Sequence, residues 1–248
     1  MVGRLTGKVA LVTGGSRGIG AAIAERLAAD GADVAISYSS SSESAERVVA
    51  GIRRSAGVRA EAFHADAADP AAVKALVPAV VEQFGRLDIL VNNAGIWQQN
   101  ILTEATEEEF DRIVGVNVRA VFLAAREAAR VMQPGGRIIN IGSVLGERVP
   151  FPGVGLYSMS KFAVAGLTRA WARDLGPRGI TVNCIQPGPV DTEMNPATGD
   201  FAAVQRQGTA LDRYGRADEI AAAASFLASP EATYVTGATI NVDGGTIA

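Results

Sequence analysis

The sequence predicts an α/β fold, with one doubly wound parallel sheet and helices on both of its faces. Three observations favour this class. Short apolar runs rich in β-branched residues, such as Val9–Thr13, alternate with longer segments that are apolar at helical spacing. The first of these strands leads through a glycine-rich turn directly into a helix. No linker or internal repeat interrupts the alternation, so we expect residues 1–248 to form a single domain.

The composition excludes several classes of protein. With 48% hydrophobic and 20% charged residues, it is ordinary for a soluble globular enzyme, and the net charge of −3 argues against nucleic acid or an anionic membrane as the main partner. Cys184 is the only cysteine, which excludes an internal disulfide and a cysteine cluster for a metal. His64 is the only histidine, and we interpret it as structural or superficial. Residues 1–8 are no signal peptide and no apolar run could span a bilayer, so we expect a cytoplasmic protein.

The turn after the first strand is suited to a pyrophosphate. Val9–Thr13 is followed by Gly14-Gly15-Ser16-Arg17-Gly18-Ile19-Gly20 and then by the helical segment Ala21–Asp30. Glycines let a ligand approach the backbone closely, and the N-terminus of a helix offers unpaired N–H groups at the positive end of its dipole. The run typical of a P-loop NTPase is not found in the sequence, so this unit favours a dinucleotide.

The second expected strand, Asp33–Tyr38, ends in a run of serines from Ser39 to Ser42. Dinucleotide-binding folds commonly place an acidic residue at this position, on the ribose 2′-hydroxyl. The serines also suit a solvated loop and the N-cap of a helix that begins near Glu43. The elements expected next are a helix, a strand, a turn and a second helix whose first turn follows Asp69 and Pro70, at residues 43–56, 58–65, 66–70 and 71–84.

The middle of the chain contains two groups of amide side chains. A strand at residues 87–91 runs into Asn92-Asn93-Ala94-Gly95, which suits a wall against a flat ligand or, equally, a turn. Residues 106–132 then read as one long helix that carries Asn117 within an apolar stretch. A buried amide is costly unless it is hydrogen-bonded, so Asn117 either fixes the backbone or holds water in a site.

Tyr157 and Lys161 form the most distinctive candidate pair for catalysis. The strand before them, at 137–141, ends at Gly142-Ser143, which places a hydroxyl at a strand end. A loop with proline and glycine then leads into a helix that is apolar through Leu175, and on it Tyr157 and Lys161 lie four residues apart on one face. A phenol titrates near pH 10 in water and a neighbouring ammonium favours the phenolate, so the two can act as an acid–base unit.

The last part of the chain is expected to add two strands, a helix and a lid. A strand at 180–186 contains Cys184 as a small core residue and ends in Pro187-Gly188-Pro189. From about 190 to 214 the pattern loosens, and a break of this length after a strand end is typical of a segment that covers substrate. A helix at 217–228 and a last strand at 236–242 follow.

Together these residues resemble the short-chain dehydrogenase/reductase family over essentially the full length of the chain. The matching motifs, in family order and at family spacing, are Thr13-Gly14-x-x-x-Gly18-x-Gly20, Asn92-Asn93-Ala94-Gly95, Asn117, Ser143, Tyr157-x-x-x-Lys161 and Pro187-Gly188. Within the family the chain looks like the bacterial 3-oxoacyl-(acyl carrier protein) reductase branch and its ketone-reducing relatives. The resemblance implies a Rossmann-type sheet of seven strands in the order 3-2-1-4-5-6-7, and commonly a homotetramer.

The resemblance also implies a nicotinamide-dependent oxidoreductase that interconverts a ketone, or a 3-oxoacyl group, and a secondary alcohol. Tyr157 would be the acid–base, and Lys161 would stabilise its phenolate and bind the nicotinamide ribose. Ser143 would polarise the carbonyl, and Asn117 would hold a proton-relay water. The implied cofactor contacts are Gly14, Ser16, Arg17, Gly18, Ile19, Gly20, Ser39, Ser40, Asp66, Asn93, Ala94, Gly95, Tyr157, Lys161, Pro187, Gly188 and Thr192.

The cofactor expected from these residues is NADP(H) in preference to NAD(H). No carboxylate ends the second strand, so nothing there would grip the 2′-hydroxyl or repel a 2′-phosphate. Arg17 lies in the glycine turn, where relatives that prefer the phosphorylated cofactor also carry a basic residue, and Ser39 and Ser40 can donate hydrogen bonds to the same phosphate. The alternative is that Arg17 lies along the surface and pairs with a nearby acid.

Two alternatives for the function remain open. The substrate could be tethered to an acidic carrier protein, with Arg126, Arg130 and Arg173 as weak candidates for its docking site. The chain could instead be a nucleotide-binding regulator, because residues 186–196 also resemble relatives linked to cyclic-dinucleotide binding and biofilm dispersal. We also expect a homotetramer, from the apolar C-terminal residues Ile240, Val242 and Ile247 and the alanine-rich helix at 217–228.

Overall fold

A sheet of seven strands runs through the centre of the computed structural model, which describes residues 3–248. All neighbouring strands are parallel, and their order is β3-β2-β1-β4-β5-β6-β7, which confirms the expected topology. The strands are β1 (Val9–Val12), β2 (Asp33–Tyr38), β3 (Ala60–His64), β4 (Ile89–Asn92), β5 (Arg137–Ile141), β6 (Thr181–Pro187) and β7 (Thr239–Val242). The central strands β1, β4, β5 and β6 are buried along their whole length, which explains their continuous apolar runs.

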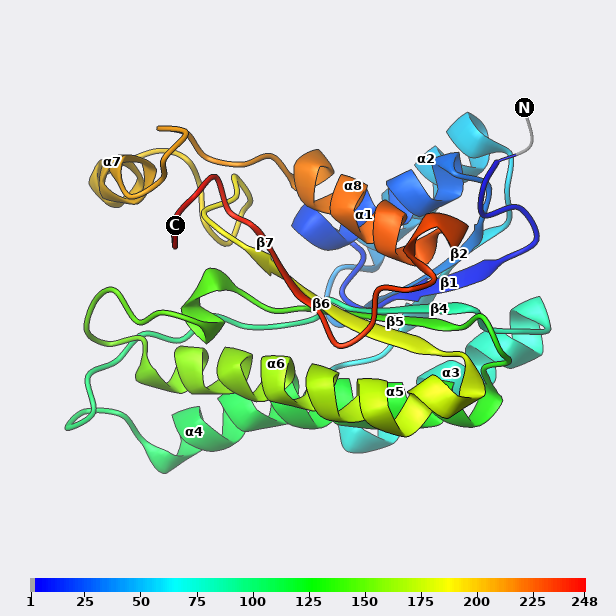
Figure 1. Ribbon diagram of the computed structural model, residues 1–248, viewed down its shortest axis with the longest axis horizontal. Helices are drawn as coiled ribbons and strands as arrows, with labels where there is room; N and C mark the ends of the chain where they lie inside the picture. The colour runs from blue at the N-terminus through cyan, green and yellow to red at the C-terminus, as the bar shows by residue number, and fades with distance from the viewer. Residues whose placement is uncertain (1–2) are drawn as a thin grey trace.

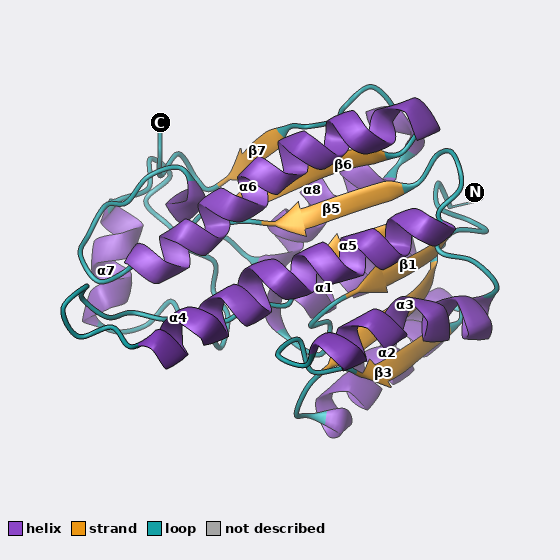
Figure 2. Ribbon diagram, turned by 90° about the horizontal axis from the view of Figure 1, so that it is seen from below, coloured by secondary structure: helices purple, strands orange, loops and turns teal. Residues whose placement is uncertain are grey.

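Helices cover both faces of the sheet, as Figures 1 and 2 show. On one face lie α1 (Gly18–Ala29), α2 (Ser42–Ala56) and α8 (Ala217–Ala228), and on the other α3 (Pro70–Phe84), α4 (Glu107–Val114), α5 (Ala120–Val131) and α6 (Gly155–Leu175). Each face has its own apolar cluster, and α1 packs against α8 through alanines such as Ala24 and Ala224, whose small side chains allow close approach.

Several helix starts follow from capping chemistry that the sequence already indicates. The hydroxyl of Ser41 accepts a hydrogen bond from Ser44 N at the start of α2, and Asp69 caps α3, with Pro70 in its first turn. Thr106 and Glu109 form a reciprocal capping box at the start of α4. These caps satisfy N–H groups that the helix itself leaves unpaired, so they fix where each helix begins.

Three elements differ from the sequence-based expectation. The first helix begins at Gly18, inside the glycine turn, because its first turn needs no side-chain cap. The expected helix at 106–132 is continuous but contains a π-helical segment, Gly115–Arg119, between α4 and α5. The last strand is shorter than expected and begins at Thr239, because Gly237, with a φ of +72°, breaks the extended backbone just before it.

The segment after β6 leaves the sheet and returns to it. Its two ends are joined by hydrogen bonds from Asp191 N to Gly215 O (3.0 Å) and from Gly215 N to Pro189 O (2.8 Å). Between them lies α7 (Asp200–Gln207), which Figure 1 shows at the same end of the molecule as the carboxyl ends of the strands. Residues 191–215 therefore form an excursion with a fixed base beside the edge where parallel α/β sheets bind ligands.

Cys184 and His64 lie where the sequence places them. The thiol of Cys184 is buried within β6, and burial raises its pKa to about 11. His64 is exposed at the end of β3, and its Nε2 lies 2.9 Å from the carbonyl oxygen of Ser39. Within residues 3–248, no helix combines the length and the hydropathy that crossing a bilayer requires.

Candidate active site

Ser143, Tyr157 and Lys161 are brought together at the carboxyl edge of the sheet. Ser143 follows β5 directly, and the other two lie on the first turns of α6, which packs back over β6 and the sheet. The ammonium of Lys161 is buried, with 6% of the residue exposed, and it donates a 3.0 Å hydrogen bond to the carbonyl of Ile141 at the end of β5. The same nitrogen lies 5.5 Å from the centre of the Tyr157 ring. Lys161 therefore links the strand end to the tyrosine.

Two hydroxyl groups at this edge have protons to donate. Ser143 Oγ accepts a 3.2 Å hydrogen bond from Leu145 N, which uses a lone pair and orients the hydroxyl. Among residues 3–248, neither the Ser143 hydroxyl nor the Tyr157 hydroxyl has an acceptor for its proton. Both side chains are partly exposed, so a carbonyl oxygen could reach them. The edge thus presents two hydrogen-bond donors beside a buried cation.

Asn117 lies in the π-helical segment and is almost fully buried, with 1% exposed. Its Oδ1 accepts from Ile96 N (2.9 Å), and its Nδ2 donates to Ile96 O (3.0 Å) and to Ser160 Oγ (3.1 Å). Both amide protons are used within the protein, so the side chain fixes the backbone after β4, the first of the two alternatives drawn from the sequence. A water at this residue would have to bind a group other than the Asn117 side-chain N–H.

Ser160 joins Asn117 to α6, the helix that carries Tyr157 and Lys161. Its hydroxyl is fully buried, accepts from Asn117 Nδ2 and donates a 2.6 Å hydrogen bond to the carbonyl of Tyr157. The sequence analysis missed this residue. Its position three residues after Tyr157, on the same helix as Lys161, is the signal that could have identified it.

The first turn of α1 fits the phosphates of a dinucleotide. Its N-cap residue, Arg17, makes no side-chain cap, and no acidic residue lies in the first turn, in contrast to α2, α3 and α4, where a hydroxyl or carboxylate caps the helix. Gly14 and Gly18 have φ of +64° and +53°, a region that favours glycine. In the glycine turn, Gly14 N and Gly15 N donate to Ser37, whereas the N–H groups of the first turn of α1, with Ile19, and that of Ser16 before it are left for an anion.

The part of the carboxyl edge that carries Ser143, Tyr157 and Lys161 is called the catalytic edge below, as a candidate. It shares one wall with the glycine turn, formed by Asn93, Ala94 and Gly95. The Asn93 amide donates to the carbonyls of Thr13 (2.9 Å) and Gly14 (3.0 Å), and Thr13 Oγ1 accepts from Asn93 N and Ala94 N. A Cβ on Gly95 would lie 3.4 Å from Asn117 Oδ1 and 3.7 Å from Lys161 Nζ. The wall therefore extends from the turn to the buried ammonium.

Thr192 and Gly188 place the segment after β6 against the same region. A Cβ on Gly18 would lie 3.4 Å from Thr192 Cγ2, so this segment passes directly over the start of α1. Gly188 follows Pro187 and donates to Val242 O (3.2 Å), and a Cβ on it would meet the Asp243 backbone at 2.7 Å. This close packing accounts for the glycine, and it fixes the direction in which the chain leaves β6.

Arg17 pairs with an acid across the glycine turn. Its guanidinium lies 2.9 Å from Glu193 Oε2, and both side chains are about two-thirds exposed, at 67% and 70%. This is the alternative that the sequence analysis set beside a phosphate-binding role. An ion pair so exposed is weak, so it leaves the guanidinium available to a more strongly charged partner.

The candidate residues for the adenosine end of the cofactor lie on the other side of the glycine turn from the catalytic edge. They are Ser39, Ser40 and Asp66. Ser39 and Ser40 are exposed just after β2, and His64 contacts the carbonyl of Ser39. Asp66 is exposed after β3, where its carboxylate accepts a 2.9 Å hydrogen bond from Ala68 N. Ser37, which the sequence analysis missed, accepts from Gly14 N at 3.3 Å and ties β2 to the glycine turn.

Trp97 was also missed by the sequence analysis. Its ring packs on the ring of Tyr157, with 4.7 Å between the ring centres and an angle of 57° between the planes. The two residues lie 60 positions apart in the sequence, and no local pattern connects them. The only available signal was an aromatic residue directly after the motif Asn93-Ala94-Gly95-Ile96.

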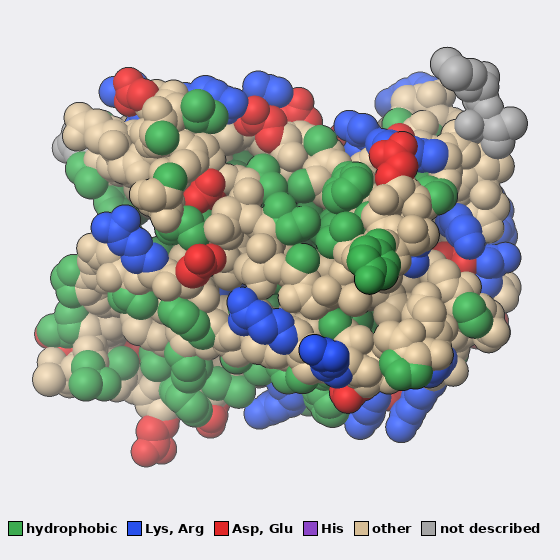
Figure 3. Space-filling model, in the orientation of Figure 1, with side chains coloured by type: hydrophobic (Ala, Val, Ile, Leu, Met, Phe, Trp, Pro, Cys, Tyr) green, Lys and Arg blue, Asp and Glu red, His purple; other side chains and the backbone are tan. Residues whose placement is uncertain are grey.

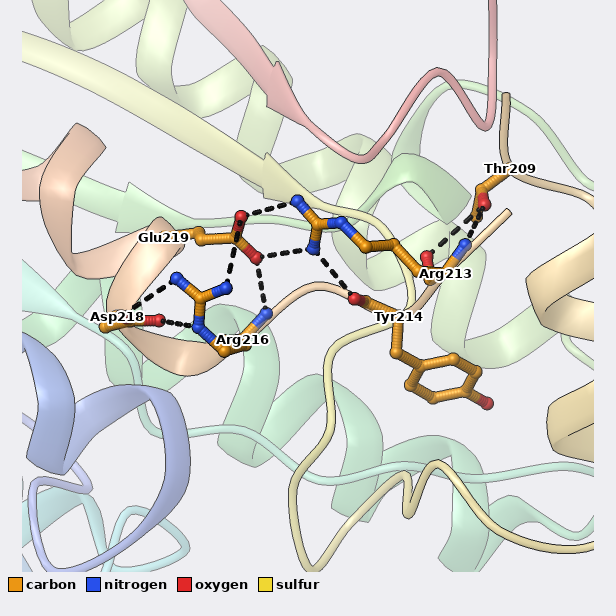
Figure 4. Close-up of polar contacts among 6 residues, drawn as sticks. All are labelled: Thr209, Arg213, Tyr214, Arg216, Asp218 and Glu219. Atoms are coloured by element: carbon orange, nitrogen blue, oxygen red, sulfur yellow. Dashed lines mark hydrogen bonds and ion pairs between the residues drawn. The ribbon is translucent and has the colours of Figure 1, made fainter. Parts of the chain in front are cut away.

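Ion pairs hold the returning end of the excursion, as Figure 4 shows. Arg213 binds both carboxylate oxygens of Glu219 on α8 (2.9 and 2.7 Å), and the backbone N–H of Arg216 donates to the same carboxylate (2.7 Å). These bonds lower the pKa of Glu219 to about 2, and the hydrogen bond from the Arg213 side chain contributes most to that shift. Tyr214 reaches back to α7, where its hydroxyl contacts the side-chain oxygen of Gln205.

The three arginines considered for carrier-protein docking do not lie at this edge. Arg126 and Arg130 are on the second half of α5, where both pair with Glu127, and Arg173 is near the end of α6. These helices run back along the sheet from its carboxyl edge, so their last turns lie near its opposite edge. These residues provide no basic patch beside the candidate site.

Comparisons with known proteins agree on one family. A family model described as enoyl-(acyl carrier protein) reductase matches residues 14–246. The chain is 45% identical to a cyclic-di-GMP-binding biofilm dispersal mediator protein of Escherichia coli K12, over 98% of both chains. It is also 45% identical to the 3-oxoacyl-(acyl-carrier-protein) reductase FabG of Staphylococcus aureus Mu50, over 96% of this chain and 97% of that protein. A short-chain dehydrogenase from Burkholderia cenocepacia, crystallised with NADP, is 55% identical with a TM-score of 0.97 and covers 99% of this chain and 100% of its own.

Proposed function

Because this chain belongs to the short-chain dehydrogenase/reductase family, we propose that it is an NADP(H)-dependent oxidoreductase that interconverts a ketone and a secondary alcohol. Nicotinamide-dependent oxidoreductase chemistry follows from the family. The observation that carries the finer proposal is the pair of hydroxyl donors, Ser143 and Tyr157, beside the buried ammonium of Lys161. This arrangement suits a carbonyl oxygen on which negative charge develops.

The cofactor, when bound, supplies a hydride to the carbonyl carbon of the substrate. Ser143 donates a hydrogen bond to the carbonyl oxygen and orients it. Tyr157 donates the proton that the oxygen needs, so the C=O double bond becomes a C–H and an O–H bond and the phenol becomes a phenolate. Lys161 stabilises that phenolate until solvent returns the proton, because its ammonium is fixed near the ring.

The residues of the glycine turn would hold the cofactor. The uncapped N-terminus of α1, with Ser16, Gly18 and Ile19, binds the pyrophosphate, and Lys161 also binds the nicotinamide ribose. The other contacts that we propose are Gly14, Arg17, Gly20, Ser39, Ser40, Asp66, Asn93, Ala94, Gly95, Tyr157, Pro187, Gly188 and Thr192. A relative crystallised with NADP supports NADP(H) as the cofactor, in agreement with the absence of a carboxylate after β2.

We propose that residues 190–214 act as a lid over the substrate. The backbone bonds between Pro189, Asp191 and Gly215 give the segment a fixed base, and α7 lies above the carboxyl edge of the sheet.

Asn117 contributes to the proposed reaction indirectly, because its side chain holds Ile96 in place. The water of a proton relay would then bind the backbone carbonyl of this π-helical segment rather than the amide side chain.

A second candidate function is that of a cyclic-dinucleotide-binding regulator. It is favoured by the 45% identity to the biofilm dispersal mediator protein of Escherichia coli, and a regulator could retain the same cofactor turn. The presence of Ser143, Tyr157 and Lys161 in one cluster favours the enzyme. The two functions predict different results with cyclic di-GMP, which a regulator binds tightly in a calorimetric titration.

We further propose a homotetramer. In the structure Phe226 of α8 is 39% exposed and Tyr234, between α8 and β7, is fully exposed, beside the apolar C-terminal strand. Large exposed apolar side chains of this kind are typical of symmetric interfaces. Sedimentation at micromolar concentration should give a species of about four times the 25.6 kDa chain mass, and a species of 25.6 kDa alone would refute the proposal.

A panel of ketones and alcohols, assayed with NADPH and NADH for reduction and with NADP⁺ and NAD⁺ for oxidation, tests the proposed function. We expect turnover of at least one ketone and its alcohol, with the phosphorylated cofactor preferred. Cofactor binding without turnover of any ketone or alcohol, together with tight binding of cyclic di-GMP, would favour the regulator instead.

A further inference from the structure

Three segments lie around the catalytic edge, and they carry few charges. Residues 94–103 and 149–160 contain no Asp, Glu, Lys or Arg, and residues 194–205 contain one such residue, Asp200. The segments are in contact with one another. Asn100 N donates to Gly153 O (2.8 Å), and the ring of Phe151 packs edge-on against the ring of Phe201 on α7, with 5.8 Å between the ring centres. These segments therefore form a rim beside the candidate catalytic residues that carries few charges.

Large apolar side chains on this rim are left uncovered. Phe201 is 50% exposed, and Ile101, Val149, Met194 and Val204 are between 46% and 65% exposed. Figure 3 shows apolar side chains at the left edge of the molecule, around a notch between the α7 region and the helices below it. A charged group of a substrate that lay against these apolar side chains would be buried without a partner, which is unfavourable.

Trp97 is the rim residue in contact with the catalytic machinery. Its ring lies on the Tyr157 ring, and its backbone is held on both sides. Before it, both backbone groups of Ile96 bond to Asn117. After it, Gln98 and Asn100 donate to the carboxylate of Glu109 (2.7 and 3.2 Å), the residue of the capping box at the start of α4. The indole is therefore on a rigid support.

We propose that Trp97 selects the substrate, and that the preferred substrate is an uncharged ketone with a flat apolar group, an aromatic ring above all, next to the carbonyl. This inference rests on the proposed function. A carbonyl oxygen at the Tyr157 hydroxyl brings one substituent of the ketone beside the ring that packs on Tyr157. An aromatic substituent gains contact with the indole beyond what burial alone supplies, whereas a small alkyl group gains little.

The test compares acetophenone, 2-butanone and 4-acetylbenzoate with NADPH. In the wild type we expect kcat/KM for acetophenone to exceed that for each of the others by about tenfold or more, since the carboxylate of 4-acetylbenzoate would lie against apolar side chains. Trp97→Ala should lower kcat/KM for acetophenone about tenfold and that for 2-butanone less than about threefold. Trp97→Phe, which keeps an aromatic ring, should retain most of the preference.

The chain contains one other tryptophan, which provides a matched control. Trp171 lies in the second half of α6 against Phe122, with 6.5 Å between the ring centres, away from the catalytic edge. Trp171→Phe should leave all three kcat/KM values unchanged. It also leaves Trp97 as the only tryptophan, so the fluorescence of that variant reports on the rim directly.

A binding measurement accompanies the kinetics. Acetophenone is titrated into Trp171→Phe in the presence of NADP⁺, a mixture in which both compounds are oxidised and cannot react, and its absorbance is corrected for with N-acetyltryptophanamide as the reference. A saturable change in Trp97 emission supports the inference. No change, at concentrations where the same ketone is reduced with NADPH, would contradict it.

The failure of this inference is distinguishable from the failure of the proposed function. If the wild type binds NADPH but reduces none of the ketones, the result contradicts the proposed function and, with it, the inference. If it reduces them and Trp97→Ala lowers kcat/KM for acetophenone and 2-butanone by the same factor, only the inference falls, because Trp97 then merely supports Tyr157. Equal or better use of 4-acetylbenzoate would also overturn it. The affinity for NADPH, measured by its fluorescence, should stay within about twofold of wild type in every variant.

Discussion

The catalytic edge and the excursion at 191–215 are held in place by different kinds of interaction. Ser143, Tyr157 and Lys161 lie on buried elements, and the network of Asn117, Ser160 and Ile96 consists of hydrogen bonds with little or no access to water. The excursion is held by exposed ion pairs, such as Arg17 with Glu193 and Arg213 with Glu219, and by two backbone bonds at its base. Buried hydrogen bonds fix geometry, whereas exposed ion pairs are weak and sensitive to salt.

This difference indicates a division of roles between the two regions. We expect the proposed chemistry to depend on the groups held by buried hydrogen bonds, and the recognition of cofactor and substrate to use also the proposed lid, which exposed ion pairs hold only weakly. Substitutions at the edge should therefore act on turnover, and substitutions in the excursion should act on affinity. The predictions below test that division, from the largest expected effect to the smallest.

Tyr157→Phe should show the largest effect on turnover and almost none on cofactor binding. It removes the proton donor and little packing, so kcat should fall by about 10²- to 10⁴-fold while the Kd for NADPH stays within about twofold. Initial rates and NADPH fluorescence on the same preparation give both numbers. Turnover like that of the wild type would refute the role proposed for Tyr157.

Lys161→Ala should affect both quantities, because one ammonium serves the phenolate and the nicotinamide ribose. We expect a large loss of kcat and an NADPH affinity that is weaker by about 10- to 100-fold. Lys161→Met, which keeps more of the buried volume, separates loss of charge from loss of packing. Lys74→Ala removes an exposed lysine on α3 and serves as the control that should change neither value.

Arg17→Ala should weaken NADPH far more than NADH, by about 10- to 100-fold in the ratio of their kcat/KM values, and Ser39→Asp should shift the preference toward NADH. Glu193→Gln is the matched control. It removes the partner that Arg17 has in the structure but keeps the guanidinium, so the affinity for NADPH should not fall. A clear preference of the wild type for NADH would overturn the assignment of Arg17, Ser39 and Ser40 to the 2′-phosphate.

Glu219→Gln should show the smallest effect, confined to the excursion. It removes the carboxylate that holds Arg213 and Arg216, so hydrogen exchange across residues 200–214 should be faster and KM for substrate should rise roughly two- to fivefold, with kcat nearly unchanged. A fall in kcat equal to that of Tyr157→Phe would contradict the division of roles.

The stability of the excursion depends on pH through the carboxylate of Glu219. Its pKa in the folded protein is about 2, lowered from 4.5 chiefly by the Arg213 side chain, so its contribution is complete above pH 4.5 and is lost as the pH falls toward 2. Hydrogen exchange of residues 200–214 in the wild type, expressed relative to the intrinsic exchange rate at each pH, should therefore accelerate as the pH falls over that range, and in Glu219→Gln it should not show this step.

The prediction of the sheet is confirmed, and the candidate residues of the catalytic edge could be named from the sequence, because both depend on local patterns. β-branched runs, the glycine turn and the spacing of Tyr157 and Lys161 are read within a few residues of each other. The caps at Ser41 and Asp69 are equally local, which explains why α2 and α3 begin within one residue of the predicted positions.

The parts that were not predicted depend on contacts between distant residues. Trp97 meets Tyr157, Glu193 meets Arg17 and Asn117 meets Ser160 only once the sheet has formed. The π-helical segment at Asn117 has a similar origin, because the amide is held by Ile96 on a different element. No spacing rule connects such pairs, so the shape of the substrate rim could not be derived from the chain alone.

Transfer of deuterium from labelled cofactor tests the central claim most directly. The wild-type protein is incubated with acetophenone and NADPH carrying deuterium at the 4R or the 4S position, and the alcohol is analysed by mass spectrometry and NMR. The account predicts that one of the two labelled cofactors delivers deuterium to the carbinol carbon, with one equivalent of NADPH consumed per alcohol. Alcohol without deuterium from either label, or consumption of NADPH without alcohol, would contradict it.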